Sequence, residues 1–479
     1  MSEPVQKSNS GVGNETGLYS EHEEWAVNMG EKTIHAKRMP GFYRSIKYFT
    51  ESFWLILFLA PYMRWNGKQA LILDVNDRQF HIFGLTILPQ DIWMVSLLLL
   101  LLAMTLFAVT SVASRVFCGY FCFQTTWVDL FTWIEEKIEG APNARHKLDA
   151  APMTGAKFGK KAFKHTLWLL ISLLTGISVI IWFEDAHVFW GNLLHFNLSM
   201  IEGATLVAFT LGTYFLAGHL REQTCLWLCP YARIQGVMCD AQTLMPTYDE
   251  KRGEPRGRLR KGAASADEPK QGDCIDCFQC VQVCPTGVDI RQGQQLGCIT
   301  CGLCLDACDS IMDKIDRPRG LIRYMTLDEV NGVPVKKLYQ HPRTLVYIGI
   351  LLIALMGIVY GLSHLGTLTL RVAPERQPLF VRMSDGSIQN KYMFKVLNKT
   401  DKDLYVKVSA EGGVKGQVIV DSDKKQLVHH GKASGFTIFV KAPEENLTRE
   451  VTKLQFRVEN VEDPNMKAEY DTVFTGPKR

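Results

Sequence analysis

The sequence lacks a strong charge of either sign. Lys and Arg together number 53 and Asp and Glu 49, which gives a formal net charge of +4, and this balance gives no reason to expect a nucleic-acid partner. The first forty residues lack an apolar run, so we expect no secretory signal peptide. Residues 366–479 contain no cysteine, which leaves neither a disulfide nor a thiolate site in that part of the chain.

Charge is also missing from two long stretches, residues 92–113 and 344–363. A bilayer core takes about 20 apolar residues as a helix, so these stretches exclude a purely soluble protein. Among the other candidate transmembrane helices, the weakest lies at about 42–62, because it carries Arg44, Lys47 and Glu51. We predict five transmembrane helices, at about 42–62, 92–113, 166–183, 198–218 and 344–363.

Lys and Arg gather in the loops that we place inside, because such residues are retained in the cytoplasm. The loop 114–165 is strongly basic, whereas residues 184–197 contain no Lys or Arg. The N-terminus and the segment 219–343 therefore also lie inside. Residues after the fifth helix are predicted to lie across the membrane.

The sequence predicts a multi-domain chain in which a five-helix transmembrane domain, a ferredoxin-like module and an all-β sandwich follow one another. After the fifth helix, short stretches with alternating apolar and polar residues predict a sandwich of about seven or eight strands. The predicted parts are a tail (1–41), a transmembrane domain (42–247), a charged linker (248–272), a ferredoxin module (273–320), a connector (321–343), the fifth helix (344–363) and an outer domain (366–479).

Eight of the thirteen cysteines form two runs with a period of 24 residues. Each run has the spacing C-x2-C-x2-C-x3-C, in which the fourth cysteine ligates the cluster of the other run. The spacing therefore predicts two [4Fe–4S] clusters. We assign Cys274, Cys277, Cys280 and Cys308 to cluster 1, and Cys298, Cys301, Cys304 and Cys284 to cluster 2.

Zinc and disulfides are the alternatives for these eight cysteines. Zinc sites commonly use two C-x2-C pairs, which leaves the rest of the repeated spacing unexplained. Disulfides conflict with the cytoplasmic side that the loop charges predict. Iron–sulfur clusters remain the favoured interpretation.

Four more cysteines form two C-x3-C pairs, Cys118 with Cys122 and Cys225 with Cys229, each just after an apolar stretch. If each stretch stays helical, residues i and i+4 share a face, and two such pairs would make a four-sulfur site at the membrane surface. Soft thiolates select Cu(I), zinc or an iron–sulfur cluster, and the sequence does not decide among them. The alternative is that these four cysteines bind no metal and are simply small buried side chains, as we expect for the isolated Cys239.

The twin cysteine runs, the C-x3-C of Cys118 and Cys122, and the CLWLCPYARIQG stretch around Cys225 and Cys229 resemble one family over nearly the whole chain. This is the FixG/CcoG/RdxA family of cytochrome c oxidase accessory proteins. The resemblance implies a multi-pass protein of the bacterial cytoplasmic (inner) membrane, with its iron–sulfur module in the cytoplasm. It also implies a periplasmic, immunoglobulin-like C-terminal domain.

The resemblance further implies a cupric reductase, which turns Cu(II) into Cu(I) during assembly of the cbb3-type oxidase. Copper is then a substrate or bound ion, and Cys118, Cys122, Cys225 and Cys229 are the proposed copper site. Expected partners are the membrane, copper chaperones or assembly factors of that oxidase and an electron donor that the sequence does not name. The outer domain would also suit a homodimer.

Two other functions fit the same residues. A pure electron relay would pass electrons from quinol or a cytoplasmic donor to a partner protein, without a substrate of its own. A redox-responsive regulatory or scaffold protein would use the clusters as sensors and the outer domain to hold a partner. Two measurements distinguish these alternatives: whether the protein binds copper, and whether quinol reduces its clusters.

Overall fold

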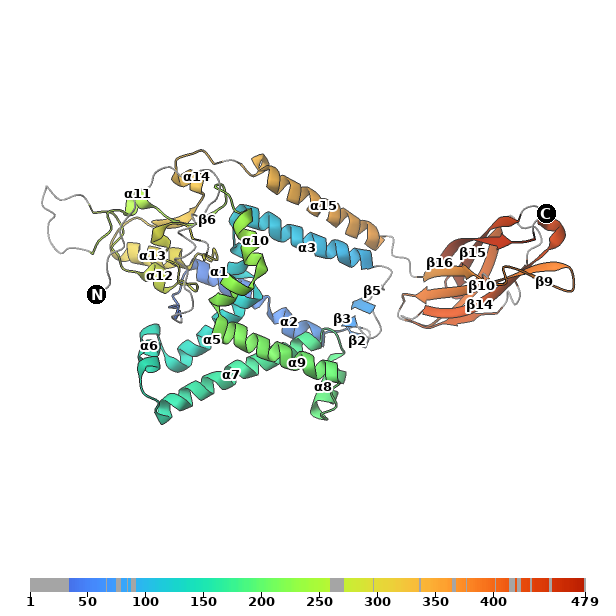
Figure 1. Cartoon of the computed structure of the whole chain (residues 1–479), viewed down its shortest axis with the longest axis horizontal. Helices are drawn as coiled ribbons and strands as arrows, with labels where there is room; N and C mark the ends of the chain where they lie inside the picture. The colour runs from blue at the N-terminus through green and yellow to red at the C-terminus, as the bar shows by residue number, and fades with distance from the viewer. Residues whose placement is uncertain are drawn as a thin grey trace. The chain divides into compact units, whose positions relative to one another are not determined.

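The structure is a computed structural model of the whole chain, shown in Figure 1. It describes residues 34–477, apart from 66, 75–78, 84, 88–91, 259–270, 296, 336, 364–367, 376, 401, 413–417, 420–423, 431–432 and 448–449. Most of the predicted N-terminal tail and the middle of the charged linker lie outside the described residues. Two compact units divide the chain, one with residues 1–58, 98–180 and 198–355, and the other with 59–97, 181–197 and 356–479.

Four helices of the described chain are long and apolar enough to cross a membrane. They are α3 (Ile92–Ala113), α7 (Gly155–Ile180), α9 (Met200–Thr213) with its π-helical continuation η4 (Tyr214–Leu220), and α15 (Pro342–Ser363). Within the first unit, α3 lies beside α15 (Figure 1), where the Ser111 and Thr344 hydroxyls are 3.0 Å apart. Helices α7 and α9 also pack together.

The segment expected as the first transmembrane helix is divided into shorter pieces. It forms α1 (Phe42–Ser52), α2 (Leu55–Leu59) and the 3-10 turn η2 (Ala60–Tyr62), and it is absent from the four candidate helices of the described chain. Arg44 and Lys47 of α1 are buried because they pair with an acidic residue of another helix. A membrane span at 42–62, and with it the count of five, therefore remains a prediction.

The basic loop 114–165 is folded into helices that the sequence did not suggest. These are α4 (Val116–Tyr120), α5 (Phe123–Glu139) and α6 (Pro142–Ala150). Three aromatic residues line the contact of α5 with α7: the Phe131 and Trp168 rings stack at 5.2 Å, and the Trp127 indole donates to Thr175 Oγ1 at 3.0 Å. The loop thus builds a platform on the apolar helices.

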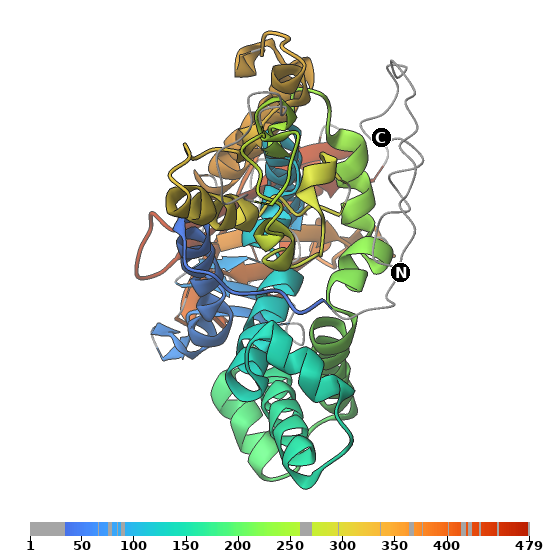
Figure 2. The same ribbon diagram turned by 90° about the vertical axis from the view of Figure 1, so that its left-hand side faces the viewer.

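The predicted ferredoxin module (273–320) lies within a longer segment of short elements around cysteine-rich loops. Strand β6 (Met245–Tyr248) pairs antiparallel with β7 (Ile322–Met325), and Figure 2 shows α13 next to α1. The helical elements are α10 (Pro230–Met238), α11 (Glu250–Gly253), α12 (Gln279–Gln282), η6 (Ile290–Gln292), α13 (Leu303–Lys314), α14 (Leu327–Val330) and η7 (Leu338–Gln340), with the π-helical η5 (Thr224–Leu228) before them.

The second unit contains a small sheet that the sequence did not predict. Its strands are β3 (Leu71–Asp74), β4 (Gln79–Ile82) and β5 (Leu85–Ile87), next to the hairpin of β1 (Arg64–Trp65) and β2 (Lys68–Gln69). The Gln69 amide donates to the Ile181 carbonyl at 2.8 Å, and Arg64 pairs with Asp185, the N-cap of α8 (Ala186–Leu194).

The C-terminal part of the second unit is a β-sandwich with an apolar core, as predicted. One sheet has the order β12-β14-β10-β8, with β9 on β10, and the other has the order β13-β11-β15-β16. Aromatic rings from the two sheets meet in the core, where Phe394 and Phe456 are 4.8 Å apart. The strands are β8 (Leu368–Pro374), β9 (Val381–Arg382), β10 (Ser387–Asn398), β11 (Leu404–Gly412), β12 (Val418–Ile419), β13 (Gln426–Val428), β14 (Ala433–Pro443), β15 (Val451–Asn460) and β16 (Lys467–Thr475).

Substitutions at two neighbouring residues of β10 test which side chains form the core of the sandwich. Phe394 is 1% exposed and Met393 is 51% exposed, because side chains alternate along a strand. We expect Phe394→Ala to lower the free energy of unfolding of the sandwich by about 3–5 kcal/mol, and Met393→Ala to leave it nearly unchanged. Protease cleavage within residues 368–475, followed during a urea titration of the full chain, measures both. Equal sensitivity of the two variants would contradict the assigned core.

Candidate metal centres

The eight cysteines of the 24-residue repeat line two cavities. Cys274, Cys277, Cys280 and Cys308 line one, and Cys284, Cys298, Cys301 and Cys304 line the other. Helices α12 and α13 pack together and position the later cysteines of each run. The two sets are those that the spacing alone grouped together.

The repeat also appears in the backbone of the two cysteine loops. Asp276 and Thr300, which are 24 residues apart, both have a positive φ, 56° and 57°. Phe278 and Gly302 repeat the feature two residues later, at 58° and 73°. Such turns curl each loop so that its cysteines face inward, and the Thr300 N–H lies 3.4 Å from Cys298 Sγ as a donor. Two successive loops are therefore built as the same metal-binding turn.

The cysteines fit iron–sulfur clusters by their chemistry as well as by their placement. Burial raises the pKa of Cys280, Cys298 and Cys308 to about 12, so these thiols keep their protons at neutral pH unless a metal displaces them. All thirteen cysteines are free thiols. The pockets suit soft, thiolate-bound groups, and no zinc-like arrangement of three ligands around one ion occurs among the described residues.

The two cavities differ in their exposure. Cys277 is exposed on the wall of the first cavity, whereas Cys301 of the second is buried. Next to Cys277, the Arg291 guanidinium lies 3.9 Å from the centre of the Phe278 ring and pairs with Asp289 at 2.6 Å. Cys277 is thus the point at which the first cavity meets solvent, since the other three cysteines of that cavity are buried, whereas three of the four in the second are partly buried.

Each C-x3-C pair spans a break between two helices. Cys118 lies in α4 and Cys225 in η5, while Cys122 and Cys229 are the extended N-cap residues of α5 and α10. The expectation of one continuous helical face is therefore wrong. The breaks have the same form, because each second cysteine donates its N–H to the carbonyl five residues earlier, at 2.9 Å in both.

The four sulfurs of these pairs, which we call the cysteine quartet, lie within electrostatic range of Cys225. Burial raises the pKa of Cys225 to about 12, and Cys122, Cys118 and Cys229 raise it further through their charges. Yet no three of the described His, Cys, Asp or Glu side chains are close enough to hold one metal ion. The quartet is a neighbourhood of four thiols that is wider than a single-ion site.

The quartet packs directly against the second cavity. Cys118 forms an apolar cluster with Val283, Ile299 and Cys301. The Tyr120 hydroxyl donates to the Cys301 carbonyl at 2.9 Å. A glycine at position 119 permits this contact, because a Cβ there would lie 2.6 Å from the Ile299 carbonyl oxygen.

Two buried polar residues next to the quartet were not predicted from the sequence. Arg115 is 5% exposed and donates to the Ala232 carbonyl at 2.6 Å. Gln235 is fully buried, and its Oε1 accepts from Cys118 Sγ at 3.3 Å. Arg115 lies just before the CGYFC stretch, and Gln235 lies inside the CPYARIQG stretch. This nearness to the paired cysteines is the sequence feature from which they could have been predicted.

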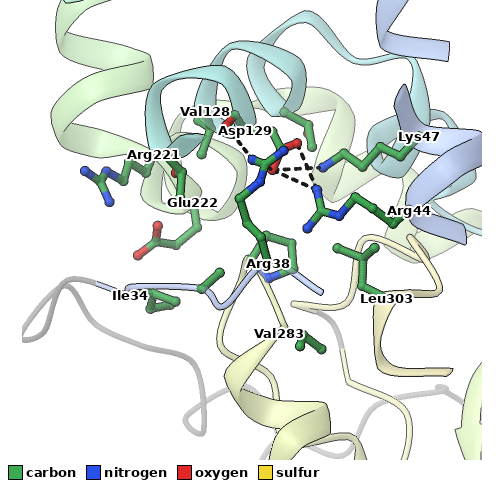
Figure 3. Close-up of a pocket in the computed structure, with 14 residues that line it drawn as sticks. Ile34, Arg38, Arg44, Lys47, Val128, Asp129, Arg221, Glu222, Val283 and Leu303 are labelled. Carbon is green, nitrogen blue, oxygen red and sulfur yellow. Dashed lines mark hydrogen bonds and ion pairs between the residues drawn. The ribbon is translucent and has the colours of Figure 1, made fainter. Parts of the chain in front are cut away.

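A buried carboxylate fastens the N-terminal segment beside the second cavity (Figure 3). Asp129 of α5 pairs with Arg38 and Arg44 at 3.0 Å each, and with Lys47 at 3.8 Å. Burial alone would raise the pKa of Asp129, but the three cations hold it at about 2. In turn, Asp306 of α13 accepts from the Arg44 backbone N–H at 3.0 Å. The start of α1 is therefore held by the platform and by the cysteine-rich module.

These features define a class, that of membrane-associated proteins with two [4Fe–4S] clusters. A 4Fe-4S dicluster domain family matches residues 220–327, and a 4Fe-4S binding domain family matches residues 95–141. The family of the immunoglobulin-like fold at the C-terminus of FixG matches residues 358–477.

The chain belongs to the FixG family. It is 38% identical to the nitrogen fixation protein FixG of Rhizobium meliloti, over 86% of this chain and 87% of that protein. It is 39% identical to the protein RdxA of Cereibacter sphaeroides, over 79% and 84% of the two chains. A crystal structure of a FixG-related protein from Vibrio parahaemolyticus aligns with 23% of this chain and 97% of that one, at 19% identity and a TM-score of 0.21.

The close approach at Gly119 gives a test of the contact between the quartet and the second cavity. In Gly119→Ala, the new methyl group must push α4 from the cysteine loop, at a cost of about 1–3 kcal/mol. We expect a lower melting temperature and an altered EPR signal of cluster 2. Gly159→Ala is the control, since nothing lies within 4 Å of its Cβ. A native signal in Gly119→Ala would contradict the contact.

The Asp129 ion pairs give a second test. Asp129→Asn removes the counter-charge of the buried Arg44 and the shorter ion pair of Arg38, so we expect the free energy of unfolding to fall by about 3–5 kcal/mol. Asp149→Asn removes a half-exposed partner of Lys161 and should cost no more than about 1 kcal/mol. Thermal unfolding in detergent, followed by tryptophan fluorescence, measures both. Equal melting temperatures would show that Asp129 does not anchor the segment.

Proposed function

We propose that the chain is a membrane-bound iron–sulfur protein that reduces Cu(II) to Cu(I) for copper delivery during assembly of a cbb3-type cytochrome c oxidase. Its membership of the FixG family and the 4Fe-4S domains support a redox function. Copper as the electron acceptor is our inference from the cysteine quartet. The observation that carries it is the packing of Cys118 against Cys301 of the second cavity.

The ligand sets follow the two cavities. We assign Cys274, Cys277, Cys280 and Cys308 to cluster 1, and Cys284, Cys298, Cys301 and Cys304 to cluster 2. Clusters of this type supply single electrons at low potential, and Cu(II) needs one electron to become Cu(I).

The quartet is the place where we expect Cu(II) to accept its electron, either bound by the thiolates directly or from a group that they hold. Thiolate ligands favour Cu(I) over Cu(II), so a sulfur-rich surrounding makes the reduction easier. The Tyr120 hydrogen bond and the small Gly119 keep this site in contact with the cysteine loop of the second cavity. The one-electron reduction of Cu(II) itself transfers no proton, and no acid–base residue is required for that step.

The membrane orientation is part of the proposal. We place the cysteine-rich module in the cytoplasm and the sandwich in the periplasm of a bacterial inner membrane, because the loop 114–165 is basic and residues 184–197 lack Lys and Arg. On this topology, copper chaperones and other assembly factors of the oxidase receive Cu(I). A homodimer through the outer domain is part of the same expectation.

One observation favours the relay as a second candidate. Cys277 and the neighbouring Phe278 are exposed, so a soluble partner can approach the first cavity. In a reductase, this face receives the electron donor. In a relay, it serves a partner protein and the quartet has no acceptor of its own.

Copper reduction is tested with the anaerobically purified chain in detergent. After reduction of the clusters and removal of the reductant, Cu(II) is added together with a Cu(I)-specific chelator. We expect Cu(I) to form as the reduced-cluster EPR signal disappears, one electron for each copper ion. In Cys225→Ala/Cys229→Ala we expect Cu(I) formation to slow by at least about tenfold.

Cys239→Ala is the matched control, because Cys239 is a buried thiol, bonded to Ser114, that belongs to neither C-x3-C pair. It should reduce Cu(II) at the native rate. Clusters that stay reduced in the presence of Cu(II), or a double variant that matches the native chain, would reject the copper assignment. Cluster oxidation by a quinone under the same conditions would then favour the relay.

A further inference from the structure

We propose that Gln235 is a positioning residue of the copper site, where its side-chain amide donates a hydrogen bond to the Cys118 thiolate once that sulfur holds copper. The inference deepens the proposed function and rests on one part of it, the role of Cys118 as a copper ligand. It concerns one amide and one sulfur, so it does not depend on how many of the other three cysteines bind the same ion.

In the structure, the oxygen end of this amide faces the sulfur. Gln235 lies on α10, the helix that begins directly after Cys229, and its Oε1 is 3.3 Å from Cys118 Sγ. An amide oxygen only accepts hydrogen bonds, so the Cys118 thiol donates its S–H proton here. The contact joins the two helix breaks, because Cys118 belongs to the first and α10 starts at the second.

The nitrogen end of the same amide has no partner among the described residues. The Gln235 side chain is 0% exposed, and its Nε2 has no hydrogen-bond acceptor there. Buried amide groups are nearly always hydrogen-bonded, because an N–H group without a partner loses its hydration for nothing in return. A purely structural role leaves this donor unexplained. The unused N–H therefore points to an acceptor that arrives with a ligand.

Copper binding supplies that acceptor at Cys118. A thiolate ligand has released its proton to water, so the sulfur then accepts hydrogen bonds and no longer donates one. The last torsion of a glutamine side chain is nearly two-fold, and a half-turn about it replaces the oxygen by the N–H without moving the rest of Gln235. The oxygen that turns away is neutral, and leaving it unpaired costs less than leaving a buried thiolate charge without a donor.

Two further hydrogen bonds hold α10 beside the first helix break. The Tyr231 hydroxyl lies 3.0 Å from the Thr110 hydroxyl, and the Ala232 carbonyl accepts from Arg115 at 2.6 Å. Ala232 and Gln235 are three residues apart and so share a face of the helix. The backbone that carries the amide is thereby fixed, and a fixed donor is what orients and tunes a metal ligand.

The hydrogen bond from Gln235 favours Cu(I) over Cu(II). Because Cu(I) has one positive charge fewer, a thiolate bound to it keeps more negative charge and accepts the stronger hydrogen bond. Hydrogen bonds to sulfur shift the potentials of iron–sulfur clusters for the same reason. The amide thus stabilises the product of the proposed reduction.

Gln235→Met tests the donor, because methionine has a similar length but cannot donate. The Cu(I) affinity of the anaerobically purified, iron-loaded full chain is measured by competition with a Cu(I)-specific chelator. We expect Gln235→Met to bind Cu(I) about ten- to a hundredfold more weakly, with the iron content of the native chain. Val237→Ala is the control, since Val237 lies on the same helix and is 83% exposed. Native Cu(I) affinity in Gln235→Met overturns the inference.

Infrared difference spectra, recorded with and without Cu(I), give a readout that a merely structural glutamine would not change. The S–H stretching band of Cys118, identified by its loss in Cys118→Ala, should disappear when Cu(I) binds. The side-chain amide band of Gln235 should shift in the same spectrum. That band is identified with isotope-labelled glutamine and by its absence in Gln235→Met or, if that variant fails to fold, in Gln235→Glu, which keeps the shape. An amide band that copper leaves unchanged overturns the inference.

The failure of this inference differs from the failure of the proposed function. A chain that reduces Cu(II) while the Gln235 band stays unchanged rejects the role of the amide and keeps the reductase. A chain that leaves Cu(II) unreduced, but whose Gln235 band shifts when Cu(I) binds, rejects the reductase and keeps the amide as part of a copper site.

Discussion

The contact between the first helix break and the second cysteine loop is the constraint on which the account depends. Gly119 allows the backbone of α4 to approach Ile299, and the Tyr120 hydroxyl fixes the distance through the Cys301 carbonyl. Electron transfer requires redox groups close together, and an apolar surrounding makes it easier by lowering the reorganisation energy. This contact provides both, because Cys301 and Ile299 are buried in the same apolar cluster as Cys118. Without it, the membrane cysteines and the ferredoxin-like loops would be separate sites.

Buried ions hold the surrounding framework in place. Glu135 of α5 pairs with Arg145, Lys164 and Arg221 at 3.1 Å each, and so joins α5 to α6, to α7 and to the end of the broken helix that leads to Cys225. Burial would raise its pKa, but Arg221, Lys164 and Arg145 hold it at about 2. Asp129 does the same for the N-terminal segment. Such networks specify one arrangement, because each cation loses a counter-charge if an element moves.

The sequence predicted the parts of the fold that local patterns encode. Cysteine spacing grouped the four thiols of each cavity, since a repeat of 24 residues reproduces the same curled loop, and alternation along the outer strands predicted the sandwich core around Phe394. Pattern reasoning failed where distant residues decide the outcome. From the sequence, Arg44 and Lys47 only weaken the case for a transmembrane helix. In the folded chain, both form ion pairs with Asp129, which is far away in the sequence. The C-x3-C pairs fit a continuous helix equally well, and only the hydrogen bonds of the folded chain show the break before Cys122 and Cys229.

Anomalous difference maps at the iron and copper edges, from crystals of the anaerobically prepared and iron-loaded chain soaked with Cu(I), test the central claim most directly. The account predicts copper density at Cys118, Cys122, Cys225 and Cys229, directly beside iron density within the second cavity. Density in the two ferredoxin-like cavities with the quartet sulfurs bare, or joined as disulfides, would contradict it. The electron path through the Gly119 contact would then have no destination.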